Sequence, residues 1–388
     1  MVKIKDPNYL KLRKVFDELQ KVIDGIINSR RRWSELPTDL VELILKKLIP
    51  SEFDLLGFRD ILRSKLVCHS WRSVAKSCSS YAPLCQTPWL LLHQNNRSSL
   101  FDPAERKVYK IRNVYENFPC ARCVGSSHGW MIIFYEDIHS QESMAHLFNP
   151  ISRSSIPLPG IQTLQSYRIS KGIISSNPFT NKNFFVVVAC HGGLAFYKHE
   201  DKSWTKFNDA LSHLYDDIMF YNDKLFALAM ESLEVWDCSG SSPIKTVHLQ
   251  DSVSHIPVDH TYLVESLGEI LRVGKGGRGN TSHFFVEKLN LTDGKWEKVQ
   301  NLGDQILFLF HNQLLSLPNQ CFLGCEENSI YYGTSDCVTH CGQEIGIYNL
   351  QYNMVRRIET ICILIGKHLE ELKHCYNAQP VWMVPNPW

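Results

Sequence analysis

The sequence predicts a multidomain α+β protein, in which a helical N-terminal part precedes an all-β propeller of six or seven blades. Two observations support this prediction. Up to about residue 80, apolar residues recur at spacings of three and four, as on one face of an amphipathic helix. Beyond that point, short strand-like runs alternate with turns rich in Gly, Pro, Asn and Asp, and their outline repeats about every 40 to 60 residues.

Length and composition are those of an ordinary globular protein. The 388 residues exceed the usual size of a single core, which indicates two domains or one large repeat architecture. Hydrophobic residues make up 44% of the chain and charged residues 21%. With 41 Lys and Arg against 40 Asp and Glu, the net charge of +1 gives no electrostatic reason to expect a nucleic acid or an anionic membrane as partner.

The termini and the cysteines indicate a nuclear or cytoplasmic protein. The N-terminal residues lack the apolar segment of a secretory signal, and no apolar run approaches the roughly 20 residues needed to cross a bilayer. The 13 cysteines are odd in number and come without a secretory address, so we expect reduced thiols.

The helical part has three predicted helices. The first covers residues 8–30 of an N-terminal extension, 1–32, and ends at three arginines. We interpret these arginines as a solvated helix end rather than a nuclear import signal. The second begins near Pro37, with Thr38 as the predicted N-cap. The third places one apolar stripe on Val67, Trp71, Val74, Ala75 and Cys78.

The helix over residues 36–48 is too apolar for a single buried face. On a helical wheel its apolar residues cover about two-thirds of the circumference, whereas a surface helix needs little more than 100°. One explanation is a partner protein that covers the second face. The other is that the helix packs between the N-terminal helix and the propeller. The apolar residues are Leu40, Val41, Leu43, Ile44, Leu45 and Leu48.

The strand-rich region repeats a common outline. "LFDPAERKVYKI" at 100 matches "LFNPISRSSIPL" at 147, and looser copies follow. Dividing about 300 residues by about 45 per blade gives about seven blades, although six strand-pair signatures are visible. The alternative architecture is an irregular β-sandwich. Because closed rings remove exposed sheet edges, we expect residues 89–93 and 380–386 to belong to the same or adjacent blades.

Two segments of the chain resemble a known family. "WSELPTDLVELILKKL" followed by "DILRSKLVCHSWRSV" resembles an F-box, which the resemblance places at residues 33–80. The chain departs from the F-box pattern by inserting "SEFDLLGFR" between these two parts. The "LFNP" turn and "GSSHGW" at 125–130 resemble the kelch-like propeller module of plant F-box proteins, which would occupy residues 81–388.

The resemblance implies a function and partners. F-box proteins are substrate-recognition subunits of SKP–cullin–F-box (SCF) ubiquitin ligases. We therefore expect an SKP-family adaptor, a cullin bound through it, and an unknown protein substrate that is ubiquitinated and degraded. By resemblance, the adaptor contact is lined by Leu36, Pro37, Leu40, Ile44, Leu45 and Leu48. It is completed or supported by Leu66, Val67, Cys68 and Trp71.

Two cysteine patterns are candidates for metal or redox chemistry. Four thiolates can hold zinc, but here each Cys pair is separated by three residues, whereas structural zinc sites prefer two. We interpret these cysteines as small buried hydrophobes and expect no metal. "CARC" at 120–123 resembles a redox pair only in its spacing, because no helix start follows it. The possible zinc ligands are Cys321, Cys325, Cys337 and Cys341, with His340 beside them.

The glycine-rich segment and the histidines also indicate no catalysed reaction. "GKGGRG" at 274–279 lacks the helix that a phosphate loop needs, so we interpret it as a blade loop whose Lys275 and Arg278 could contact an acidic ligand. No Ser-His-Asp order connects His128, His191, His199 and His283. We expect no catalytic residue and no cofactor. The alternative from another class is a propeller enzyme or small-molecule sensor with a helical extension.

Overall fold

The computed structural model forms two compact units, one ending at Leu84 and the other beginning at Cys85. The predicted N-terminal helix at 8–30 and the insertion at 51–59 lie outside the described residues. The structure describes residues 33–48, 64, 67–78, 88–94, 97–102, 107–118, 121–136, 142–160, 162, 169–208, 215–229, 232–240, 242–250, 258–277, 281–310, 313–319, 325–334, 344–358 and 381–383.

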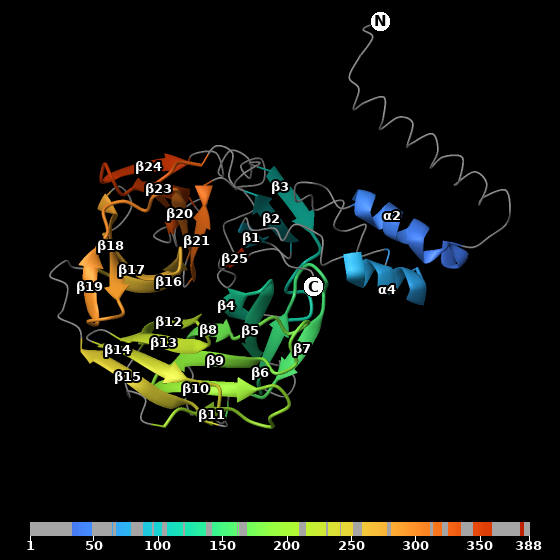
Figure 1. The fold of residues 1–388 in the computed structure, drawn as a ribbon, viewed down its shortest axis with the longest axis horizontal. Coiled ribbons are helices and arrows are strands. Elements are labelled where there is room, and N and C mark those ends of the chain that lie inside the picture. The colour runs from blue at the N-terminus through green and yellow to red at the C-terminus, as the bar shows by residue number, and fades with distance from the viewer. Residues whose placement is uncertain are drawn as a thin grey trace, which may run out of the picture. The chain divides into compact units, whose positions relative to one another are not determined.

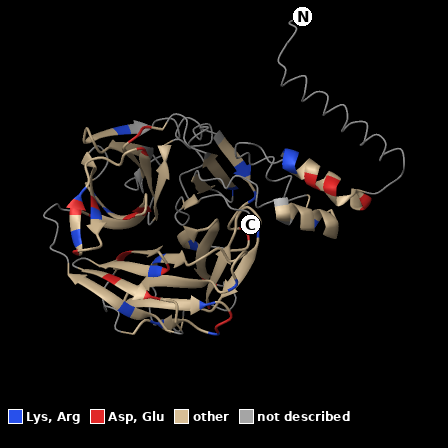
Figure 2. Ribbon diagram, in the orientation of Figure 1, with Lys and Arg blue, Asp and Glu red and all other residues tan. Residues whose placement is uncertain are grey.

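The first unit contains the turn η1 (Trp33–Glu35) and the helices α2 (Thr38–Leu48) and α4 (His69–Cys78). The carbonyl of Pro37 accepts the Val41 N–H at 3.1 Å. Pro37 therefore takes the N-cap position and Thr38 is the first helical residue, so the helix begins one position earlier than predicted. Figure 2 shows acidic residues toward the start of α2 and lysines at its end, as the helix dipole favours. No helix in the described part is long and apolar enough to cross a membrane.

Helices α2 and α4 pack through a small apolar seam. Val41 and Leu45 from α2 are fully buried, as is Ala75 from α4. The indole N–H of Trp71 donates to the carbonyl of Trp33 at 2.8 Å, which ties η1 to α4. Val67 was predicted to belong to the α4 stripe, but it lies in the turn before the helix and is 46% exposed. The stripe begins only at the first turn of α4.

The second unit is a six-bladed β-propeller (Figure 1). Each sheet is one blade, so the predicted propeller is confirmed with six blades, and the alternative of an irregular sandwich is excluded. From inside to outside, the first blade is β25 (Val381–Met383), β1 (Trp89–Gln94), β2 (Arg97–Asp102) and β3 (Lys107–Ile111), and the second is β4 (Arg122–Ser127), β5 (Trp130–Glu136), β6 (Ser143–Phe148) and β7 (Ser155–Leu158). The third blade is β8 (Ile169–Ile174), β9 (Phe185–Cys190), β10 (Gly193–Lys198) and β11 (Thr205–Lys206), and the fourth is β12 (Tyr215–Tyr221), β13 (Lys224–Ala229), β14 (Ser232–Asp237) and β15 (Ile244–Gln250). The fifth blade is β16 (His260–Ser266), β17 (Glu269–Gly276), β18 (His283–Asn290) and β19 (Lys295–Lys298), and the sixth is β21 (Gln313–Pro318), β20 (Gln305–Phe310), β22 (Ser329–Thr334), β23 (Glu344–Asn349) and β24 (Met354–Ile358).

The ring closes by pairing the two ends of the propeller. Strand β1 is antiparallel to β25, with Leu90 opposite Trp382 and Trp89 opposite Met383. This confirms the prediction that residues 89–93 and the C-terminal strand share a blade. The inner strands contact one another in sequence around the ring, from β25 through β4, β8, β12 and β16 to β21. The inner strands are the edges of their sheets, but the closed ring keeps these edges short and protected around the channel.

The sequence repeats correspond to turns capped by Asn or Asp side chains. Asn149 accepts backbone N–H groups of residues 151 and 152 at 3.0 Å, and Asn290 accepts that of residue 292 at 3.0 Å. Asp237 accepts the N–H of residue 239 at 2.9 Å, and Asn349 accepts that of residue 351 at 3.1 Å. Such side chains favour tight turns because they bond to the backbone two residues on. The repeated Asn or Asp therefore marks the end of the strand that enters the last turn of a blade.

The "GSSHGW" motif forms the hairpin between β4 and β5. His128 and Gly129 form its two-residue turn with positive φ angles of 53° and 80°. Trp130 begins β5 and is 1% exposed within the core between the second and third blades. Gly125 lies where β4 approaches β8, and it has no side chain because the backbone of Gly172 occupies that space.

The last blade departs from the simple up-and-down order. Strand β20 pairs antiparallel with β21 and parallel with β22. Residues 305–318 form a hairpin whose second strand, β21, turns inward and adds a fifth strand beside the channel. Its tip brings Gln313 close to β4 of the second blade, where it donates to the carbonyl of Ser126 at 3.0 Å.

Candidate functional site

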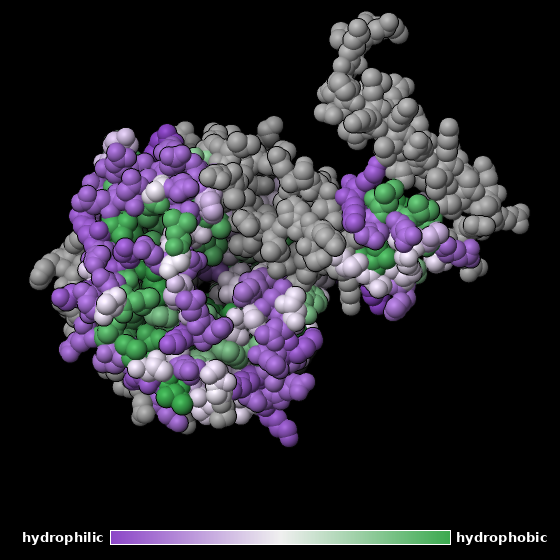
Figure 3. Space-filling model, in the orientation of Figure 1, coloured by the Kyte–Doolittle hydropathy of each residue, from purple (hydrophilic) through white to green (hydrophobic). Residues whose placement is uncertain are grey.

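Helix α2 carries apolar side chains on the side away from its buried seam. Leu43 is 46% exposed, and Leu40 and Ile44 are half-buried. These three residues follow the spacing of one helix face, whereas Val41 and Leu45 face α4. Hydrophobic side chains are visible at the surface of the helix pair in Figure 3. The sequence prediction of two apolar faces on this helix is thus matched by two distinct sets of side chains.

The predicted adaptor residues fall into different environments. Leu36, Leu45 and Trp71 are buried, so they support the surface rather than offer it to a partner. Leu43 was left out of the predicted contact, although its apolar character on the wheel was a usable signal. Pro37 and Val67 are exposed, Leu40, Ile44 and Cys68 are half-buried, Leu48 is the last residue of α2, and Leu66 lies outside the described residues.

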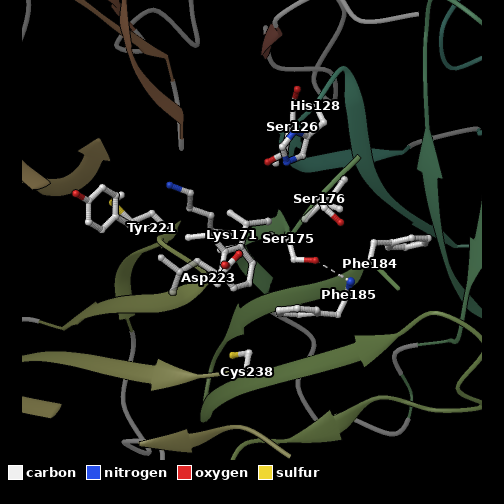
Figure 4. Close-up of a pocket in the computed structure, with 18 of the residues that line it drawn as sticks. Ser126, His128, Lys171, Ser175, Ser176, Phe184, Phe185, Tyr221, Asp223 and Cys238 are labelled. Atoms are coloured by element: carbon white, nitrogen blue, oxygen red, sulfur yellow. Dashed lines mark hydrogen bonds between the residues drawn. The ribbon is translucent and has the colours of Figure 1, made fainter. Parts of the chain in front are cut away.

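The propeller contains a pocket of about 1100 Å³ at its centre. Its walls are residues of the inner strands β4, β8, β12, β16 and β21, and of several turns. Figure 4 shows Lys171 in the middle of the pocket, with Tyr221 and Asp223 on one side and Ser126 and His128 on the other. The pocket is therefore built from five blades at once.

The turns that line the pocket lie at one end of the ring. In a four-stranded up-and-down sheet, the turns after the first and third strands lie at the same end. The lining residues His128, Ser176 and Asn222 belong to first turns of three blades. Glu200 and Ser239 belong to third turns. The pocket therefore opens at the end of the propeller that carries these turns.

A buried ion pair forms part of the pocket wall. The ammonium of Lys171 in β8 donates to the carboxylate of Asp217 in β12, and Asp217 is fully buried. The same carboxylate accepts the N–H of Leu263 in β16 and of Ile218, both at 2.7 Å. Burial raises the pKa of Asp217, while Lys171 and these N–H groups act in the opposite direction. Asp217 thus links three consecutive blades beside the channel.

Two pocket residues carry buried polar atoms without a partner in the described structure. The Gln313 side chain donates through Nε2, but its Oε1 accepts no hydrogen bond. The Nδ1 atom of His199 is likewise unpaired, and its ring stacks on Phe184 at 4.7 Å. Burial lowers the pKa of His128, which favours the neutral imidazole. The pocket therefore combines hydrogen-bonding capacity with mostly neutral walls.

The sequence candidates for metal or redox chemistry do not come together in the described part. Cys325 is half-buried, whereas its three proposed partner cysteines and His340 lie outside the described residues. Burial raises the pKa of Cys123 to about 12, so its thiol stays protonated. Among described residues, no group of three His, Cys, Asp or Glu side chains is placed to hold a metal ion.

In the described part of the glycine-rich segment, Gly276 pairs with His283, whereas the other three predicted histidines belong to other blades. Lys275 is in β17 with its ammonium 5.4 Å from the centre of the Tyr332 ring, and Arg278 lies outside the described residues. His191 is exposed in the turn between β9 and β10. His283 starts β18 and contacts the carbonyl of Thr281 at 3.4 Å. Of the four predicted histidines, the pocket includes His128 and His199.

Comparison with known proteins matches both units. The family model described as the KIB1-4 beta-propeller matches residues 100–349, and the F-box domain model matches residues 33–82. Three relatives come from Arabidopsis thaliana, each 26% identical to this chain. A putative F-box protein covers 84% of this chain over 88% of its own length. The match to the F-box/kelch-repeat protein KIB1 covers 73% of this chain and 74% of KIB1. The match to the F-box protein SKIP23 covers 85% of this chain and 92% of SKIP23.

Proposed function

Because this chain belongs to the KIB1-4 β-propeller family and carries an F-box, we propose that it is the substrate receptor of an SCF ubiquitin ligase. The F-box binds an SKP-family adaptor, and through it a cullin. The propeller captures a target protein for ubiquitination and degradation. The names of the relatives, all F-box proteins, support this assignment.

The exposed apolar face of α2 is the observation that supports adaptor binding. Leu40, Leu43 and Ile44 offer apolar surface beside a helix seam that is already filled. Fully burying one such side chain contributes about 1.5 to 3 kcal/mol relative to leaving it in water. A partner that covers the three together gains a useful part of its binding free energy from this face. Pro37 and Val67, both exposed, extend the same proposed contact.

The chain is proposed to act without bond chemistry of its own. Its mechanism is proximity: it holds a substrate lysine near a charged conjugating enzyme and so raises the effective concentration of the reacting groups. The propeller suits capture because its turns can vary on a rigid ring, and loops on a rigid scaffold commonly carry binding specificity. The central pocket lies at one turn-bearing end of that ring.

A titration of the full chain with a purified SKP-family adaptor tests the proposal. The double variant Leu40→Ala, Ile44→Ala should weaken adaptor binding at least tenfold, since tenfold corresponds to about 1.4 kcal/mol. Leu43→Ala should weaken it as well. All variants should keep the melting temperature of the propeller.

The matched control removes an exposed apolar residue of the propeller. Leu291, between β18 and β19, is 63% exposed, and Leu291→Ala should leave adaptor affinity unchanged. If the α2 double variant and this control bind the adaptor equally well, α2 is not the docking surface. If the unmodified chain binds no SKP-family adaptor, the ligase assignment itself is wrong.

A further inference from the structure

The ammonium of Lys171 has hydrogen-bonding capacity to spare within the central pocket. A lysine ammonium has three N–H donors. Among the described residues, Asp217 is its hydrogen-bond partner, and that carboxylate also receives two backbone N–H groups. Lys171 is 8% exposed and lines the pocket. In Figure 4 its side chain extends into the pocket between Tyr221 and His128. The remaining donors are therefore available to a bound molecule.

Gln313 supplies the opposite chemistry to the same pocket. Its Nε2 is held by the carbonyl of Ser126, which fixes the amide plane. Its Oε1 is buried and accepts no hydrogen bond from the described residues. Buried polar atoms are normally paired, so an unpaired acceptor in a pocket wall points to a ligand donor. The pocket thus offers both a donor and an acceptor from rigid elements.

The charges around the pocket favour a neutral ligand group. Its lining includes three lysines and three carboxylates, and Asp217 lies behind Lys171. A ligand carboxylate has acceptors only and would leave the Gln313 oxygen unpaired. An ammonium or guanidinium has donors only and would face Lys171. An amide has both a carbonyl and an N–H group. The charged lining residues are Lys171, Lys182, Lys198, Glu200, Asp223 and Glu265.

We propose that the pocket binds an amide group of a peptide segment of the captured substrate. In this arrangement the amide carbonyl accepts from Lys171 and its N–H donates to the Oε1 of Gln313. The amide belongs to an Asn or Gln side chain or to the peptide backbone. This inference rests on the proposed function, because it specifies what the receptor recognises.

Exposed apolar side chains at the same end of the ring favour a polypeptide over a small molecule. Phe179 and Leu267, in first turns of the third and fifth blades, are 41% and 69% exposed. Ile244 and Leu291, at or next to third turns, are 66% and 63% exposed. Exposed apolar surface of this kind is typical of protein contact sites. A protein that inserts one segment into the pocket can also contact these turns, whereas a small molecule within the pocket cannot.

A displayed library of random dodecapeptides, selected on the full chain, tests the inference. Enriched peptides are synthesised and titrated against the unmodified chain and two variants. The two variants are Gln313→Met and Lys171→Met. Gln313→Met removes the unpaired acceptor and leaves the Lys171–Asp217 ion pair intact, so it tests the inference even if Lys171→Met fails to fold. Both variants should weaken peptide binding at least tenfold. Gln300→Met and Lys206→Met, exposed positions after β19 and at the end of β11, lie at the opposite end of the ring and should bind peptide as the unmodified chain does.

The peptide sequences distinguish the two sources of the amide. Asn or Gln enriched at one position, with at least tenfold loss on replacement by Asp or Leu, identifies a side-chain amide. Dependence on Gln313 without such enrichment, and loss on N-methylation of one peptide bond, identifies a backbone amide. An acidic or basic consensus, binding that ignores Gln313, or no enriched peptide at all would overturn the inference.

The adaptor titration on the same variants separates this result from the proposed function. Gln313→Met should bind the adaptor like the unmodified chain, because its site lies within the propeller. If the chain binds no adaptor but selects amide peptides through Gln313, the ligase assignment fails and the pocket chemistry stands. If it binds adaptor but selects no such peptide, the pocket inference fails alone.

Discussion

Gly125 in β4 and Gly172 in β8 bring two neighbouring blades into backbone contact. A Cβ atom placed on Gly125 would overlap the carbonyl oxygen of Gly172. Because the obstructing atom belongs to backbone, no side-chain rotation can relieve the overlap. The spacing of these two inner strands therefore depends on glycine at position 125.

Gly125→Ala should lower the stability of the propeller. Overpacking a tight contact typically costs about 1 to 3 kcal/mol, and denaturant titration of the full chain measures it. Gly240→Ala is the matched control, because a Cβ there would meet its nearest neighbour at an ordinary 3.6 Å. Equal stability of the two variants would show that β4 can move away from β8 at no cost.

Removing residues 380–388 should make the chain aggregate. The deletion eliminates β25 and leaves β1 with an unpaired edge, and exposed strand edges promote association between chains. It also removes Trp382, whose ring is 1% exposed and packs on Phe308 at 5.3 Å. Light scattering and thermal melting measure the effect. Deleting only 384–388 keeps β25 and should change little. A monomeric chain that melts normally without residues 380–388 would contradict ring closure as a source of stability.

A buried carboxylate stabilises the fourth blade. Glu234 in β14 accepts from Tyr215 at 2.5 Å, from Lys245 at 2.6 Å and from Trp236 at 3.3 Å. Glu234→Gln turns one acceptor into a donor that faces other donors, so the free energy of unfolding should fall by about 1 to 3 kcal/mol. Glu136→Gln, at the exposed end of β5, is the control and should be neutral. A neutral result at Glu234 would mean that the donors find other acceptors.

Asp216, the bulged residue of β12, should make stability depend on pH. Although Asp216 is exposed at the bulge, partial desolvation of its carboxylate, and then repulsion by Asp217, raise its pKa from 3.8 to about 6. Between these values the folded chain holds a proton that the unfolded chain has released, so this group lowers stability as the pH rises. Asp216→Asn should therefore raise the melting temperature at about pH 8. The gain should shrink below about pH 6 and vanish near about pH 4.

The control for this pH profile is Asp304→Asn, at an exposed turn. Its melting temperature should follow that of the unmodified chain across the same range. A gain for Asp216→Asn that stays constant with pH would assign its effect to packing rather than to titration.

Part of the candidate site was predictable because it depends on local pattern. The spacing of Leu40, Leu43 and Ile44 is a property of one helix, so a wheel finds the surplus apolar face. The wheel could not show that Leu45 turns inward, because that depends on where α4 packs. The pocket was not predicted at all. Lys171 and Gln313 carry no motif, and their roles arise from separate blades that meet at the channel.

The sequence alone predicts the two helices that the structure describes, the strand repeats, their Asn and Asp turns, and the terminal strand that closes the ring. These features follow from periods of 3.6 and 2 and from bonds between near neighbours. Tertiary structure decided which residues meet between blades. Lys171 and Asp217 are 46 residues apart, as are Asp217 and Leu263. Only the register of inner strands around a closed ring makes them partners. Strand periodicity predicts on which face of the sheet a side chain lies, but it does not predict which residue of the next blade lies opposite.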